Sequence, residues 1–399
     1  MSSLCLLPLL LAGAGSITLI ATPAEPVLGT DTSVVLELEA PADATELRVF
    51  ASRGRVEQLT APGPGGRRAV YFLPAERVPQ WAVLIATASS PRGQVHGVLV
   101  VPLLGQAVAN VKAGAREPVT LHVGARTFGP VAADDEGRAR IPILVPPGVE
   151  EARHRGGRVH LGVPPVQRLF AVVDRTQLTV DEAAEALVYL VALGREGAPR
   201  ATPISLSSDR GTVGEATPLS AGLFAARWRF EAGRPGRARL SASFDGAPGP
   251  AVADVELVAG PARTFELIAP ELVHAGDEAL ELEVRALDAA GNPAVAELRA
   301  STALGAVALT ERSPGRYGAS LPLDPSFAGR TELELQLTRG GTQVGATRVR
   351  LVSGPAAHIE VLPSAAEVTP DGRAPAAFQL AVSDRFGNPV SEPPVVTWR

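Results

Sequence analysis

Apolar and polar side chains alternate strictly along many short segments of this chain. In residues 280–286 (LELEVRA) and 332–337 (ELELQL), each apolar residue is followed by a charged or polar one. The same alternation is found at 34–39, 348–351 and 378–382. A period of two places the apolar side chains on one face of a β-strand and the polar ones in water. Because Gly, Pro, Asp and Ser interrupt the segments every 8–12 residues or so, roughly the spacing of short sandwich strands, we predict an all-β fold built from β-sandwiches.

One segment, residues 181–193 (DEAAEALVYLVAL), fits a helix as well as a strand, because good helix formers follow an acidic first turn. An internal repeat decides between the two. It places Val188 and Leu190 opposite Leu282 and Val284 of an alternating segment. We therefore predict a strand over residues 187–193.

The repeat is marked by a turn that occurs three times. Its copies are Gly197-Ala198-Pro199, Gly291-Asn292-Pro293 and Gly387-Asn388-Pro389, with glycines 94 and 96 residues apart. A second mark, LVAGPA at 257–262, is matched by LVSGPA at 351–356, again with glycines 94 residues apart. A fixed period is the signature of a tandem array, and one of about 94 residues corresponds to a whole domain.

The first part of the chain carries the same pieces at a longer spacing. Residues 52–56 (SRGRV) resemble 208–213 (SDRGTV), and the two glycines lie 157 residues apart, which is one repeat and 63 further residues. A smaller domain should fill that difference. The predicted division is a signal peptide at 1–15, sandwiches at 16–104, 167–260 and 261–354, a small module at 105–166, and an incomplete fourth sandwich at 355–399.

The turn motif resembles one found in bacterial Ig-like domains of the invasin and intimin type. Asp384-Arg385-Phe386-Gly387-Asn388-Pro389-Val390 carries the resemblance most closely, and Asp288 to Pro293 carries it less closely. Gly adopts positive φ at no steric cost, Asn tolerates similar angles, and Pro presets the exit of the turn. Gly197 and Pro199 belong to a third copy that lacks both Asp and Asn. The resemblance implies tandem Ig-like sandwiches in an elongated array, in which these ten turn residues are structural: Gly197, Pro199, Asp288, Gly291, Asn292, Pro293, Asp384, Gly387, Asn388 and Pro389.

The short module is of a different kind. Residues 134–138 (DDEGR) and 141–148 (IPILVPPG) are similar to the small transthyretin-like β-sandwich modules that are appended to secreted proteins. We therefore expect residues 105–166 to form one smaller β-sandwich module.

Composition excludes several classes of protein. With 37 Lys and Arg against 42 Asp and Glu, the net charge of −5 argues against a nucleic-acid binder. The apolar run at Leu4–Leu11, followed by Ala12-Gly13-Ala14, predicts a cleaved export signal, although no basic residue precedes it; a mis-called start or a buried first strand is the alternative. We expect no transmembrane segment. Removing residues 1–15 would remove Cys5, the single cysteine, so no disulfide framework is expected.

Candidate chemistry is sparse. Asp134, Asp135 and Glu136 are the candidates for binding calcium, but no Asp-x-Asp-x-Asp array surrounds them, and a solvated turn is the alternative. Arg153, Arg155 and Arg158 form the one basic cluster, a candidate polyanion contact or simply an exposed loop. The sequence lacks a Gly-x-Ser-x-Gly elbow, a phosphate loop and a His-Glu-x-x-His motif. We expect no enzyme, no cofactor and no metal.

Three functional hypotheses remain. The first is a non-enzymatic extracytoplasmic protein of the adhesion type, a rod of Ig-like domains that acts as a stalk or binding scaffold for an unknown protein or cell-surface glycan. The second is an accessory region of a larger secreted enzyme or polysaccharide-processing protein. The third is an envelope assembly factor that uses strand donation. It arises because residues 355–399 hold only three expected strands (359–362, 378–383 and 395–399). Three explanations are open: the sequence is a fragment of a longer array, which we favour, strands of a partner complete the half-domain, or the half-domain packs on the fourth domain.

Overall fold

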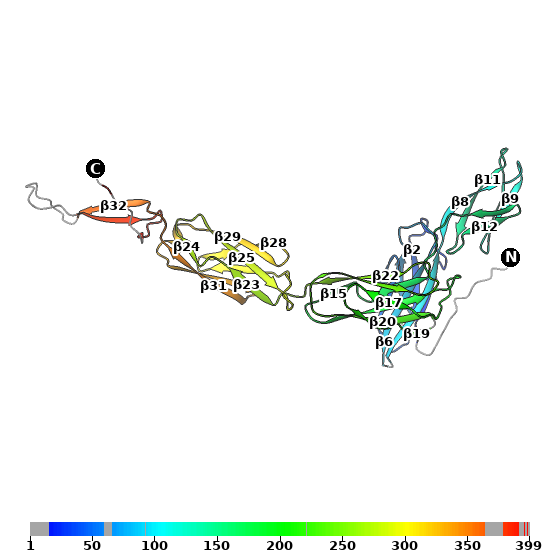
Figure 1. Ribbon diagram of the computed structural model, residues 1–399, viewed down its shortest axis with the longest axis horizontal. Coiled ribbons are helices and arrows are strands. Elements are labelled where there is room, and N and C mark those ends of the chain that lie inside the picture. Colours follow the sequence, from blue (N-terminus) through cyan, green and yellow to red (C-terminus); the bar gives the residue numbers. More distant parts are fainter. Residues whose placement is uncertain are drawn as a thin grey trace, which may run out of the picture. The chain divides into compact units, whose positions relative to one another are not determined.

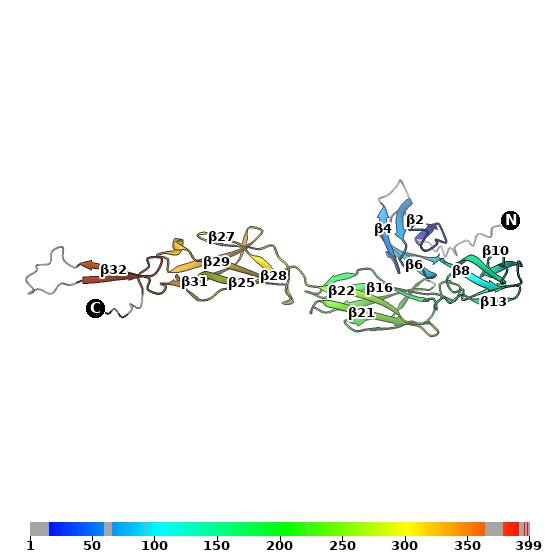
Figure 2. The same cartoon turned by 90° about the horizontal axis from the view of Figure 1, so that it is seen from above.

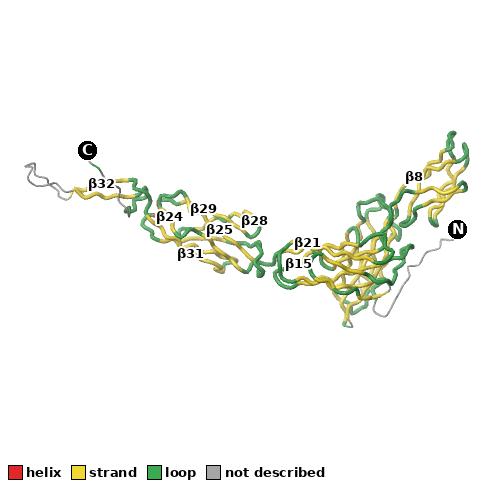
Figure 3. Tube along the Cα trace, viewed as in Figure 1, coloured by secondary structure: helices red, strands yellow, loops and turns green. Residues whose placement is uncertain are grey.

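The computed structural model describes residues 16–59, 66–91, 93–220, 222–363 and 378–390, together with residues 395 and 397. This part of the chain contains 33 β-strands and one short 3-10 helix, so the predicted all-β class is confirmed (Figure 3). It divides into two compact units, the first ending at Leu257. The second unit contains the residues from 258 onwards and two short segments that come earlier in the sequence, 179–183 and 231–235. The segment 1–15, where an export signal is expected, lies outside the described residues.

The first sandwich has two antiparallel sheets, in the order β1-β2-β5-β4 and β3-β6-β7. Leucines and alanines at alternate positions of its strands point between the sheets and form a core of their own, for example Leu36 and Leu84. Its strands are β1 (Thr18–Thr22), β2 (Ser33–Glu39), β3 (Thr45–Ala51), β4 (Arg55–Leu59), β5 (Gly66–Phe72), β6 (Gln80–Ser90) and β7 (Gly93–Leu103).

The small module is also a sandwich, with a four-stranded sheet, β10-β9-β12-β13, facing a two-stranded one, β11-β8. Leu121 and Ile141 are central to its separate core. Figure 1 shows β8 and β11 side by side. The strands are β8 (Gly105–Lys112), β9 (Pro118–Val123), β10 (Arg126–Ala132), β11 (Arg138–Val145), β12 (Glu151–His154) and β13 (Gly157–His160).

The next sandwich repeats the topology of the first, with sheets β14-β16-β20-β18 and β15-β22-β21-β17. The strand predicted over 187–193 is β16, and Trp228 of β20 is fully buried, its indole N–H donating to the carbonyl of Arg210 over 2.8 Å. β21 and β22 pair along most of their length (Figure 2). The strands are β14 (Leu169–Val173), β15 (Gln177–Thr179), β16 (Ala184–Ala192), β17 (Ser205–Ser208), β18 (Thr212–Val213), β19 (Thr217–Ser220), β20 (Leu223–Phe230), β21 (Gly236–Ser243) and β22 (Ala251–Val258).

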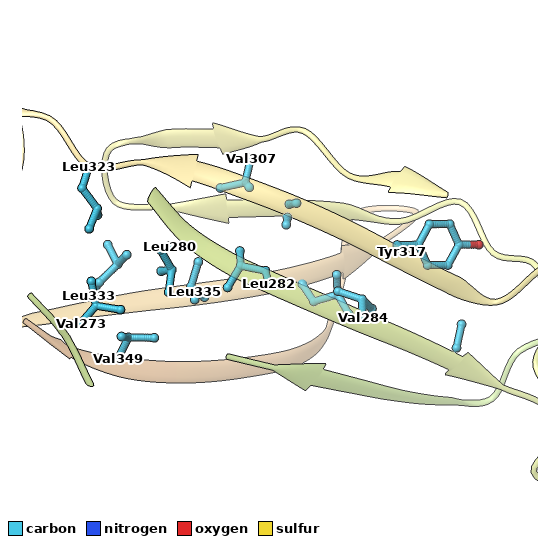
Figure 4. Close-up of a cluster of buried hydrophobic side chains, with 14 of the residues drawn as sticks. Val273, Leu280, Leu282, Val284, Val307, Tyr317, Leu323, Leu333, Leu335 and Val349 are labelled. Atoms are coloured by element: carbon cyan, nitrogen blue, oxygen red, sulfur yellow. The ribbon is translucent and has the colours of Figure 1, made fainter. Parts of the chain in front are cut away.

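The sandwich of the second unit has the same plan, with sheets β23-β25-β29-β28 and β24-β31-β30-β26-β27. Figure 4 shows Leu282 and Val284 from one sheet facing Leu333 and Val349 from the other. Its elements are β23 (Thr264–Ile268), β24 (Leu272–His274), β25 (Ala279–Leu287), β26 (Arg299–Thr302), β27 (Gly305–Val307), β28 (Thr310–Ser313), β29 (Arg316–Pro322), the 3-10 helix η1 (Pro325–Phe327), β30 (Glu332–Arg339) and β31 (Thr342–Val352).

The last described element is a two-stranded sheet, β32 (His358–Pro363) and β33 (Phe378–Ser383). Two of the three strands expected between residues 355 and 399 are therefore present. The third, 395–399, lies outside the described residues except for Val395 and Thr397, neither of which is in a strand.

Within the first unit, two sandwiches share a hydrophobic core in addition to their own. Val83 and Ile85 of β6 pack against Tyr189 and Val191 of β16. β6 is therefore covered on both faces, because Leu84, its neighbour in sequence, points into the core of the first sandwich. This face-to-face packing of β3-β6-β7 on β14-β16-β20 differs from the end-to-end order that the repeat spacing suggests.

Aromatic contacts extend the shared core to one end. Tyr189 stacks on Phe50, with ring centroids 6.0 Å apart, and meets the edge of His96 at 5.8 Å. Burial lowers the pKa of His96 and raises the pKa of Tyr189 to about 12, so both rings are neutral at pH 7. The contact between the two sandwiches is therefore uncharged at pH 7, although His96 and Tyr189 are titratable.

Candidate functional site: the Gly-Asn-Pro turns and their linkers

The turn that contains Gly291 is closed by the carboxylate of Asp288. Asp288 Oδ1 accepts hydrogen bonds from the backbone N–H of Ala290 (2.9 Å) and of Asn292 (2.8 Å). The backbone closes the same loop, because Asp288 N–H donates to Asn292 O at 2.9 Å. Gly291 stands at φ +81°, where glycine is the least strained residue. The aspartate therefore specifies the turn through its own following backbone, as the motif suggested.

The second carboxylate oxygen of Asp288 holds the linker that precedes the sandwich. Asp288 Oδ2 accepts from Gly260 N–H and from Asn292 Nδ2, each at 3.0 Å. Only 2% of the Asp288 surface is exposed, so these bonds form away from solvent. One side chain thus joins two segments 28 residues apart in the sequence. We call this arrangement of aspartate, asparagine and linker glycine the latch.

A second latch has the same bonds at the next repeat. Asp384 Oδ1 accepts from Phe386 N–H and Asn388 N–H, both at 2.9 Å. Asp384 Oδ2 accepts from Gly354 N–H at 3.0 Å and from Asn388 Nδ2 at 2.9 Å. The shared sequence pattern therefore encodes a shared set of contacts between a turn and the linker before it.

Each latch also reaches a loop that comes earlier in the chain. Asn292 Nδ2 donates to Gly233 O at 2.8 Å, and Gly329 N–H donates to Asn388 Oδ1 at 2.6 Å. Gly233 follows β20 and Gly329 follows β29, which are equivalent strands in the two sandwiches. The asparagine thus ties the turn to the same loop of the preceding repeat in both cases.

An arginine near each latch makes one further contact with an earlier loop. Arg263 forms an ion pair with Glu182 at 2.8 Å, and Arg385 donates to Asp277 O at 3.0 Å. Glu182 and Asp277 lie in the loops before β16 and β25, again equivalent positions. Because these side chains are exposed, the ion pair contributes at most about 1 kcal/mol, and the buried bonds of the aspartate dominate.

The electrostatics of the latch favour charged aspartates. Burial raises the pKa of Asp288, but hydrogen bonds donated by Asn292, Gly260 and Ala290 outweigh burial and leave the pKa below its usual value. The pKa of Asp384 is lowered in the same way, by Gly354, Asn388 and Phe386. Both carboxylates are therefore ionised at pH 7, which makes their hydrogen bonds stronger than neutral ones.

The third copy of the turn keeps the backbone and loses the latch. Gly194 stands where the other copies have aspartate, and its N–H donates to Ala198 O at 2.8 Å. Gly197 has φ +81°, the same value as Gly291. Instead of a polar partner, Gly197 abuts the indole of Trp81, since a Cβ at Gly197 would lie 2.5 Å from ring carbons. This turn belongs to the sandwich that packs face to face on the first one.

Gly197 and Gly291 form a matched pair for substitution. Gly291→Ala should lower the free energy of unfolding by about 1–2 kcal/mol through backbone strain alone, because nothing lies within 4 Å of the new Cβ. Gly197→Ala should cost more and shift the fluorescence of Trp81, because the ring must move. Thermal unfolding and tryptophan emission of the two variants test this. Equal losses with unchanged emission would contradict the contact with Trp81.

The acidic candidates lie at the turn between β10 and β11, all of them exposed. Asp134 Oδ1 accepts from Arg138 N–H at 2.7 Å, Asp135 pairs with Arg116 at 2.9 Å, and Glu136 pairs with Arg138 at 3.3 Å. Across the described residues, no group of three or more His, Cys, Asp or Glu side chains could hold a metal ion. Calcium binding at this turn stays an untested prediction.

The basic candidates lie on the hairpin formed by β12 and β13. Arg153 and Arg158 are directly opposite each other, Arg155 is in the connecting turn, and all three are exposed. Arg158 pairs with Glu151 at 3.1 Å. The structure thus gathers them on one small hairpin, and polyanion binding there stays a prediction.

Sequence reasoning identified the turn but missed the residues that it holds. The residues that were missed bond to the turns through backbone atoms, which cannot be recognised from the residue type. They are Gly260, Gly354, Gly233 and Gly329. The available signal was the common period of the Gly-Pro linker and the Gly-Asn-Pro turn. That common period shows that the linker and the turn recur together in the sequence, but it does not show that they are in contact.

No family model matches the chain, and no curated protein matches it. Among the described residues, no helix is long and apolar enough to cross a membrane. Solved structures with a similar arrangement include InvD of Yersinia pseudotuberculosis, at 18% identity and TM-score 0.39, covering 56% of this chain and 72% of InvD. Invasin, a bacterial integrin-binding protein, is similar at 13% identity and TM-score 0.38, covering 92% and 67%. FdeC, an Escherichia coli adhesin, is similar at 16% identity and TM-score 0.32, covering 85% and 97%. Invasin and a bacterial adhesin are thus among the solved structures to which this chain is similar, and invasin-type proteins are the group that the turn motif resembles.

Proposed function

We propose that this chain is a non-enzymatic, extracytoplasmic structural protein of the adhesion type, in which successive sandwiches form a scaffold that presents a binding surface. Its modules would be residues 16–104, 105–166, 167–260, 261–354 and 355–399, after a signal at 1–15. The observation that carries the proposal is the latch. The same buried aspartate, asparagine and linker glycine recur at 288 and at 384.

The latch suits a protein whose task is to hold domains in series. A linker without side-chain partners leaves neighbouring domains free to move. Here the linker amides of Gly260 and Gly354 are each bonded to a buried carboxylate that also closes a turn of the following strand pair. Ordering a linker costs conformational entropy, and charge-assisted bonds offset that cost. Such joints have an evident use in a stalk or scaffold.

Export is the most direct test of this role. The full chain, tagged after residue 399, should be recovered outside the cytoplasm of a bacterial host, and deletion of residues 1–15 should retain it inside. Externally added protease should degrade the tagged product in intact cells if it is at the outer surface. Quantitative recovery of the intact full chain from the cytoplasm would overturn the proposal. Assays of hydrolase activity on polysaccharides, run on the same material, address the alternative of an accessory region of a secreted enzyme.

A second candidate, assembly by strand donation, is favoured by the exposed apolar face of β32 and β33. Ile359, Val361 and Phe378 are 52%, 46% and 54% exposed. One repeat earlier, Leu282 occupies the position of Phe378 and is buried between two sheets (Figure 4). Strands supplied by a partner protein would cover this face. Gentle purification should then yield a stable complex of fixed stoichiometry, and recovery of the chain alone would contradict this candidate.

A further inference from the structure

The small module leaves one long strand edge open. Its sheet β11-β8 has two strands, so in the described part of the chain β8 is paired along one side alone. β8 runs over eight residues, contains no proline, and carries a single charge, Lys112, at its end. An edge of this kind presents a row of backbone donors and acceptors to any extended chain.

Most other edges among the described strands are short, irregular or covered, and β32 and β33, which are also open, have six residues each. β17 has four residues, and β3 is interrupted by a register shift next to Glu46 at φ +51°. β11, the partner of β8, carries Pro142 and two arginines. β7 is long, but Ile17 N–H donates to its His96 O at 3.1 Å. Proteins blunt sheet edges by such means, and of these β8 has only a single charged residue, Lys112, at its end.

Side chains beside β8 define what an added strand should look like. Val108 is 49% exposed, and the first half of β8 borders a hollow of about 350 Å³ that is also lined by Phe128 and Ile143. At the other end, Lys112 lies opposite Arg138, and Asn110 lies opposite Arg140, all of them exposed. The edge is therefore apolar at one end and positively charged at the other.

We propose that β8 is a strand-addition site for an extended segment of another protein, with apolar side chains at alternate positions near Val108 and acidic ones near Lys112. Main-chain hydrogen bonds along the edge would supply affinity, and the hollow and the basic end would supply direction. The proposal rests on the proposed scaffold role, for which it names the binding surface. The test of strand addition uses purified protein and does not depend on export. The strand-addition proposal and the scaffold proposal can therefore be refuted independently.

The experiment uses the full chain and an eight-residue peptide of alternating Val and Thr that ends in two Glu. Two versions, with Glu at the N- or C-terminus, cover both strand directions. Titration calorimetry should detect binding of one version, and hydrogen exchange of the amides in 105–112 should slow at least tenfold. Val108→Lys should weaken binding at least tenfold, because a charge on an edge opposes strand pairing. Val252→Lys is the control, since Val252 is 46% exposed and lies in β22, a strand of another sandwich.

Lys112 supplies an independent readout because it is the single lysine of the chain. Its acylation should slow when the acidic peptide binds and stay unchanged with a peptide that lacks Glu. Asn110→Asp, on the same exposed face, replaces Val108→Lys if that variant does not fold, because a carboxylate there repels the acidic end of the peptide. Absence of protection at 105–112, or equal binding by the variants and the wild type, would overturn the proposal.

Discussion

Asp288→Ala should lower the free energy of unfolding of the β23–β31 sandwich by about 2–4 kcal/mol. The substitution removes the acceptor for Gly260, Ala290 and Asn292 together, and buried donors without acceptors cost about 1–3 kcal/mol, more where the missing partner is charged. Scanning calorimetry of the full chain should show one transition moved down by roughly 10 °C or more. Asp384→Ala should release the equivalent linker at Gly354.

Asp324 provides the matched control in the same sandwich. It caps the 3-10 helix η1 by accepting from Ser326 N–H at 2.8 Å, but it is exposed. Asp324→Ala should therefore cost about 1 kcal/mol or less. A loss at Asp288 no greater than the loss at Asp324 would show that the latch contributes little.

The latch should also make stability depend on pH in the acid range. The folded-state pKa values of Asp288 and Asp384 lie below the value of about 3.9 for an unfolded aspartate. The unfolded chain then binds more protons as the pH falls, so the contribution is complete above that value and is lost as the pH falls through it towards the folded-state pKa. In Asp288→Ala the acid-induced loss should be smaller than in the wild type.

Ile85→Asp should separate the first sandwich from the one that packs on it. Ile85 is fully buried in the shared core with Val191 and Tyr189, and an unpaired buried charge is not tolerated there. The milder Ile85→Ala should cost about 2–5 kcal/mol in the free energy that holds the two sandwiches together. Calorimetry should then show two separate transitions for these two sandwiches, which should unfold in a single transition in the wild type.

Leu84 is the control that distinguishes docking from folding. It is equally buried but belongs to the core of the first sandwich alone. Leu84→Ala should destabilise that sandwich by a similar amount without splitting the transition. If Ile85→Asp leaves a single transition at the wild-type temperature, the shared core does not hold the sandwiches together.

Much of the fold could be predicted because local patterns and the repeat agree. Alternation at 280–286 specified a strand with one buried face, and the repeat resolved the ambiguous segment at 181–193 in favour of β16. The ambiguity itself had a structural cause. Leu190 points into its own sandwich and Val191 into the shared core, so β16 is apolar on both faces and loses the alternation of a half-buried strand.

The lateral packing of two sandwiches could not be predicted from the repeat, because a period gives the order of modules and not the faces that meet. The signal was the unbroken apolar run from Trp81 to Ala86, which indicates burial on both sides of β6. At the candidate site, the turn residues could be predicted because Asp, Gly, Asn and Pro each have a conformational preference that suits a position in the turn. The linker amides that they bind could not be predicted, because every residue except proline has a backbone N–H group.

Hydrogen exchange of the two linkers shows whether the turns hold them. The amides of Gly260 and Gly354 should exchange slowly in the intact chain, since each donates to a buried carboxylate. Asp288→Ala should release Gly260 alone, and Asp384→Ala should release Gly354 alone. If both amides exchange in the wild type as fast as in an unstructured peptide, the turns do not hold the linkers, and this protein is not a scaffold of latched domains.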